Sequence, residues 1–220
     1  MELNKFINCL KFLHSKMSES ITNYYINERI NDWYEKDSNL YAVVKNDLGH
    51  ISHALKESYL ITFSKLFDED FKESICVQNL MKIIQSCKIV KDDLTHKSLK
   101  EFATKVLLII ENTKTELNNL NTWRDKYLAH YDKKLRNNDA LLKETKCNVE
   151  LVLNLVENVY NLFNDILTSL GQEKISSSHN TFENSIDTLF FNFELGEKVL
   201  RQEGYEKLNS IISTINFPNS

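Results

Sequence analysis

The scarcity of glycine and proline constrains the fold of this chain more than any other feature. Only four glycines and one proline occur among 220 residues, and the proline, Pro218, stands almost at the end. Tight β-hairpins and the loops of β-sandwiches rely on these two residue types at their turns. The composition therefore predicts an all-α protein.

Apolar side chains recur three and four positions apart in several stretches, which is the spacing of one face of an α-helix. The stretches predict one or two helices over residues 2–35, a helix ending near Phe67, a short helix over residues 77–84, a long helix starting at a Ser98–Glu101 capping box, and a helix ending before Gly171. No repeat and no sustained heptad pattern is visible, so we expect a helical bundle. Residues 1–171 would form this bundle, including its N-terminal helical segment, and residues 172–220 a C-terminal helical arm.

The distribution of charge points to one local segment. A formal net charge of -4 argues against binding nucleic acid through bulk charge. Residues 122–136, which we call the basic segment, nevertheless carry an excess of three positive charges. Its charged residues are Arg124, Lys126, Lys133, Lys134 and Arg136 against Asp125 and Asp132. A polyanion is therefore expected to meet the chain there.

Cysteine spacing and hydropathy indicate the compartment. The four cysteines are far apart, and the N-terminus lacks the pattern of a signal peptide. No apolar run approaches the ~20 residues that cross a bilayer. We expect reduced thiols, a cytoplasmic location and no membrane contact.

Arg124 and His130 lie six positions apart in the stretch "WRDKYLAHYDKKLR", residues 123–136. Thr122 is a candidate N-cap after the asparagines at 118, 119 and 121, which would place Arg124 in a first helical turn, where a phosphate is also favoured. A continuous helix bent at the asparagines is the alternative. The two side chains would stand about 120° apart around a helix and about 9 Å apart along it, so a second copy of the chain could complete the pair. A solvated helix face with local ion pairs is the plainer interpretation.

The segment Arg124–His130 resembles the R-x(4-6)-H motif of the HEPN superfamily (higher eukaryotes and prokaryotes nucleotide-binding). The longer run "RDKYLAHYDKKL", with "SYLITFSKLFDED" and "ICVQNLMKII" upstream, is similar to the AbiU-like branch, which is associated with abortive phage infection. The resemblance implies an antiparallel helical bundle, here with extra N- and C-terminal helices, that pairs as a homodimer. In active members it implies metal-independent cleavage of RNA by attack of the ribose 2′-OH on the adjacent phosphate, with no cofactor.

On this resemblance His130 is the general acid or base, Arg124 holds the phosphate, and Asp125 orients one of them. The expected RNA contacts are Lys126, Lys133 and Lys134 to the backbone and Tyr127 and Tyr131 to bases, with core packing as the alternative for at least one tyrosine. An antitoxin protein is an expected partner if the chain belongs to a toxin system.

Two other interpretations remain open. The chain could be a non-catalytic HEPN-fold module that binds RNA, a nucleotide or a protein, or a helical interaction domain in which Arg124 pairs with an acid in the core. His50 and His53, with Asp47, could meet one metal ion on a helix, although a polar face without metal is favoured and no metal site is expected. Motifs of P-loop nucleotide hydrolases, serine hydrolases and zincins are missing from the sequence.

Overall fold

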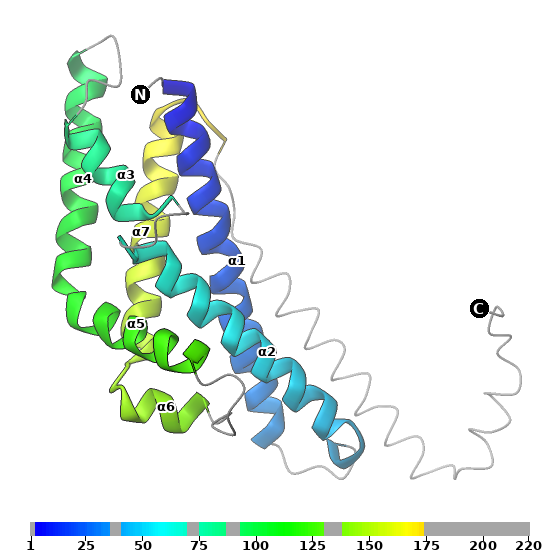
Figure 1. Cartoon of the computed structure of the whole chain (residues 1–220). Helices are drawn as coiled ribbons and strands as arrows, with labels where there is room; N and C mark the ends of the chain where they lie inside the picture. Colours follow the sequence, from blue (N-terminus) through cyan, green and yellow to red (C-terminus); the bar gives the residue numbers. More distant parts are fainter. Residues whose placement is uncertain (1–2, 36–40, 70–74, 87–92, 130–137, 174–220) are drawn as a thin grey trace, which may run out of the picture.

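The computed structural model describes residues 3–35, 41–69, 75–86, 93–129 and 138–173. Within these ranges every regular element is an α-helix, so the predicted all-α fold is confirmed (Figure 1). The helices are α1 (Leu3–Glu35), α2 (Tyr41–Phe67), α3 (Val77–Ser86), α4 (Asp93–Asn112), α5 (Lys114–Ala129), α6 (Asn138–Glu144) and α7 (Val149–Ser169). None of these helices is long and apolar enough to span a bilayer. The predicted arm, apart from residues 172 and 173, lies outside the described residues.

Helix α7 is the centre of the bundle. It lies between α1 and α4 and runs antiparallel to both (Figure 1). Its buried face carries Val152, Val156, Val159 and Phe163, and the Phe163 ring lies 5.5 Å from that of Phe102 on α4. Apolar residues three and four apart therefore favour the helix and also its packing, because α1 and α4 remove the same apolar stripe from water.

Both ends of α7 follow local signals. Asn148 caps the N-terminus, and its Oδ1 accepts a hydrogen bond from the backbone N–H of Leu151 at 3.1 Å. Gly171 has a φ of +74°, a left-handed conformation that costs glycine little, and the N–H of Gln172 returns to the carbonyl of Leu167. The predicted end before Gly171 is confirmed.

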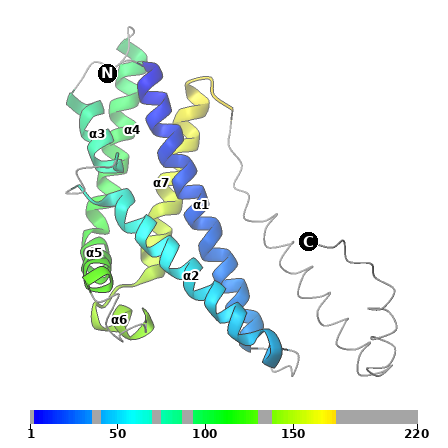
Figure 2. The same ribbon diagram turned by 45° about the vertical axis from the view of Figure 1, so that its right-hand side comes forward.

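Helix α2 crosses α1 obliquely, and the two helices pack together along much of their length (Figure 2). The predicted end of α2 at Phe67 is confirmed, and the next residue, Asp68, is no longer helical. The end of α2 faces α5, while α3 packs on α4. The motif arginine therefore lies where the end of α2 meets α5.

The asparagine-rich break predicted before Thr122 is wrong. Helix α5 is continuous through residues 118–121, and the chain bends instead at Thr113, between α4 and α5. Thr122 donates to the carbonyl of Asn118 from within the helix, so it is not a cap. Ser98 is likewise internal, because α4 already begins at Asp93.

Candidate functional site

Helix α5 presents Arg124 well inside its length, so the predicted place in a first turn is wrong. The neighbouring aromatic residues hold this part of the helix against the core. Trp123 is fully buried, Tyr127 is 5% exposed, and their rings stack with centroids 5.0 Å apart. Tyr127 therefore packs in the core, which is the alternative that the sequence left open for at least one of the two tyrosines.

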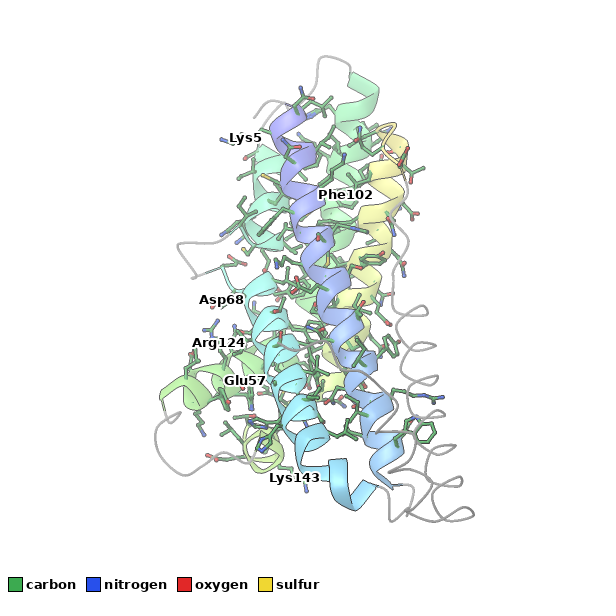
Figure 3. The ribbon with its side chains drawn as sticks, turned by 90° about the vertical axis from the view of Figure 1, so that its right-hand side faces the viewer. Lys5, Glu57, Asp68, Phe102, Arg124 and Lys143 are labelled. Atoms are coloured by element: carbon green, nitrogen blue, oxygen red, sulfur yellow. The ribbon has the colours of Figure 1, made fainter. Side chains whose placement is uncertain are left out.

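The guanidinium of Arg124 is bound to the carboxylate that follows α2. Its Nη1 donates to Oδ2 of Asp68 at 2.5 Å, and each side chain is only 10% exposed (Figure 3). Burial lowers the pKa of Arg124, but the hydrogen bonds that it donates to Asp68 and Asp125, with the negative charge of both carboxylates, outweigh burial and raise the pKa above its usual value. The arginine is therefore permanently charged and fixed in direction.

The second edge of the guanidinium is bound by the next residue. Nε and Nη2 of Arg124 donate to Oδ1 of Asp125 at 2.9 and 2.8 Å. Unlike Asp68, the Asp125 side chain is 67% exposed. Arg124 thus has an inner edge anchored to a buried acid and an outer edge held only by an acid at the surface.

A further hydrogen bond joins the same two helices. Ser64, one turn before Asp68, donates to Oδ1 of Asn121, about one turn before Arg124, at 2.7 Å. The two contacts form a short ladder between the end of α2 and α5. This ladder fixes the position of the motif helix relative to α2.

The basic segment is neutralised where the structure describes it. Lys126 pairs with Glu144 of α6 at 2.6 Å, and Arg124 is bound by two carboxylates. The expected excess of positive charge is therefore not presented as free charge by residues 122–129. His130, Tyr131, Asp132, Lys133, Lys134 and Arg136 lie outside the described residues. Their predicted roles stay predictions.

A groove of about 780 Å³ lies beside the ladder, between the end of α2, α3, α4 and the first half of α5. We call it the α2–α5 groove. Asp68 and Asn121 both contribute to its lining. The anchored arginine therefore stands next to a space that can receive a ligand of moderate size.

A family model, HEPN_AbiU2 (AbiU2), matches residues 3–187. The chain belongs to the AbiU2 family of HEPN domains. No curated protein and no solved structure matches the sequence significantly. The AbiU2 match begins with the first residue of α1. It also continues past residue 171, and the division predicted there stays a prediction.

The AbiU2 fold brings together residues that sequence reasoning did not connect. Asp68 follows the helix that the sequence predicts to end near Phe67, and it lies within the "SYLITFSKLFDED" run that carries part of the resemblance. Its pairing with Arg124 has no signal in the spacing. The metal candidates stay open, because the side chain of Asp47 is not described; among the described residues no group of three metal-binding side chains occurs.

Proposed function

We propose that this AbiU2 protein is a metal-independent endoribonuclease in phage defence or a toxin system. One observation carries the proposal: Arg124 of the motif is anchored through Nη1 to buried Asp68, while its Nε and Nη2 edge is held by exposed Asp125. A guanidinium that a buried acid fixes on one side and a solvated acid holds on the other suits a bidentate contact with a phosphate once the solvated acid gives way.

The outer edge of Arg124 would bind the scissile phosphate by exchange. Asp125 is largely solvated, so its ion pair with Arg124 is worth little and can be replaced by phosphate oxygens. Asp68 keeps the guanidinium in place during the exchange because it is buried on the other side. Negative charge that builds on the phosphate in the transition state is then stabilised by a preoriented cation.

His130 would transfer the protons. Attack of the 2′-oxygen on phosphorus forms a 2′,3′-cyclic phosphate and breaks the bond to the 5′-oxygen. One imidazole acts as a base and removes the proton of the 2′-OH. A separate acid donates a proton to the leaving 5′-oxygen. In a homodimer the two copies of His130 would serve as base and acid, which removes the need for Arg124 and His130 to share one helix face.

The test compares RNA cleavage by His130→Ala, Arg124→Lys and wild-type protein. Arg124→Lys keeps the charge opposite Asp68 but loses the planar fork, so cleavage should fall while the fold is kept. The double variant Asp68→Asn with Arg124→Gln also removes the guanidinium that is proposed to bind the phosphate, and it leaves no buried charge unpaired. Products should carry 2′,3′-cyclic phosphate ends. Full cleavage by both His130→Ala and Arg124→Lys would overturn the proposal.

The second candidate function is that of a non-catalytic binding module, and the burial of Arg124 favours it. The residue is only 9% exposed and is bound by two carboxylates, which is also the arrangement of a structural ion pair. Such a module would bind RNA, a nucleotide or a protein without producing cyclic phosphate ends. Circular dichroism of the same variants separates loss of activity from loss of structure.

A further inference from the structure

We propose that the α2–α5 groove binds a nucleobase. The base would belong to an RNA strand whose phosphate lies at Arg124, and this part of the inference rests on the function proposed above. The groove is distinct from the R-x5-H motif, since its walls come from α3 and α4 as well as from α2 and α5.

The charged side chains of the groove have no spare charge for a phosphate. Asp68 is bound by Arg124, Glu69 pairs with Lys82, and Glu111 pairs with Lys114 at 3.1 Å. These pairs include all five charged residues that line the groove. The ligand group that enters is therefore expected to be neutral.

Gln78 supplies the unused hydrogen-bonding group. The residue lines the groove and is 8% exposed, and its Oε1 has no hydrogen-bond partner among the described residues. A buried carbonyl oxygen without a partner is unfavourable unless a ligand satisfies it. The amide offers an acceptor and donors side by side, which is the pattern that glutamine uses to bind the edge of a base, adenine above all.

The remaining lining suits a flat ring. Phe67, Ile110 and Leu117 are buried apolar residues along the groove, and Leu108 at its wall is 61% exposed. Apolar surfaces that cover the faces of a base, with a few polar groups at its edge, are the usual means of binding single-stranded RNA. The volume of about 780 Å³ leaves room for a base and its ribose.

The groove is also in the right place for an RNA substrate. Asp68 belongs both to its lining and to the anchor of Arg124, and Asn121 lies one turn before Arg124 on α5. A nucleotide whose phosphate is held at Arg124 could therefore place a neighbouring base in the groove. Gln78 would then contribute to the choice of sequence at the cleavage site.

The experiment uses the full chain with two kinds of probe. One is the four uncharged nucleosides, titrated while the side-chain amide signal of Gln78 is followed by NMR. The other is a short, fluorescein-labelled, single-stranded RNA with 2′-O-methyl groups, which cannot be cleaved. Gln78→Met keeps the volume and removes the carboxamide, and Gln172→Met beyond α7 is the matched control.

We expect at least one nucleoside to shift the Gln78 signal and Gln78→Met to weaken RNA binding roughly tenfold, with the salt dependence of binding unchanged because no phosphate contact is lost. Gln172→Met should bind as wild type. If nucleosides bind but the RNA does not, the groove is a site for free nucleosides or nucleotides, and the ribonuclease proposal fails while this inference stands. If RNA binds wild type and Gln78→Met equally and no nucleoside shifts Gln78, the nucleobase site is wrong and the ribonuclease proposal is unaffected.

Discussion

Asp68 and Arg124, 56 residues apart in sequence, form an ion pair in which both side chains are nine-tenths buried. The pair joins the end of α2 to the helix that carries the R-x5-H motif. Removing either partner leaves a buried charge with incomplete compensation, so the pair has consequences for stability as well as for the proposed chemistry.

Asp68→Ala is expected to lower the free energy of unfolding by roughly 3–5 kcal/mol, because Arg124 then stays buried with only Asp125 as a partner. Asp125→Ala, which removes the exposed partner, should lower it by less than about 1 kcal/mol. Urea denaturation of the two variants measures both effects. Equal losses would show that Asp68 has no special role in holding Arg124.

Asp125→Asn is expected to strengthen binding of 2′-O-methylated RNA at low salt. The substitution removes a negative charge from the edge of Arg124 that the phosphate is proposed to occupy, and relief of roughly 1 kcal/mol of repulsion corresponds to about fivefold tighter binding. Fluorescence anisotropy measures the change, with Asp165→Asn on α7 as a control of the same charge. Unchanged or weaker binding would contradict exchange of Asp125 for phosphate.

Acid is expected to destabilise the fold through His14. This residue of α1 is fully buried, its ring stacks on Tyr160 at 4.1 Å, and neither ring nitrogen has a hydrogen-bond partner among the described residues. Burial lowers the pKa of His14 to about 4, and nearby Asn164 opposes the shift without meeting hydrogen-bond geometry.

The direction of the effect follows from the lowered pKa. His14 binds a proton near pH 6.5 in the unfolded chain but only near pH 4 in the folded chain. The stability of the fold is therefore unaffected by this residue above about pH 6.5, and it decreases as the pH falls from there toward 4. At about pH 5 the loss should be ~2 kcal/mol. His14→Phe should lose less stability than wild type between neutral pH and pH 5 in urea denaturation. An identical loss in both proteins would contradict the role of His14.

Phe163→Ala is expected to cost roughly 3–5 kcal/mol of unfolding free energy, because it opens a cavity where α7 meets Phe102 of α4. Leu151→Ala on the same helix, where the side chain is 47% exposed, should cost less than about 1 kcal/mol. Thermal unfolding followed by circular dichroism compares them. Similar midpoints for both variants would mean that the centre of the bundle does not lie at Phe163.

The course of α5 shows where local reasoning about helices failed. Asparagine lowers helix propensity, and three of them predicted a break at 118–121. The helix continues because tertiary contacts offset this weakness: Asn121 accepts from Ser64, and Asn119 donates to the carbonyl of Lys146. The bend occurs instead at Thr113, between α4 and α5.

The sequence by itself determined the helical class, the course of α7 to its end before Gly171, the end of α2 at Phe67 and the membership suggested by the Arg124–His130 motif. Each of these depends on neighbours within a few turns, where spacing is informative. Only the tertiary structure decided that Tyr127 faces the core, that Asp68 binds Arg124, and that Gln78 lines a groove beside them. The partner of a charged or amide side chain is set by which helices pack together, and the order of residues along one helix does not contain that information.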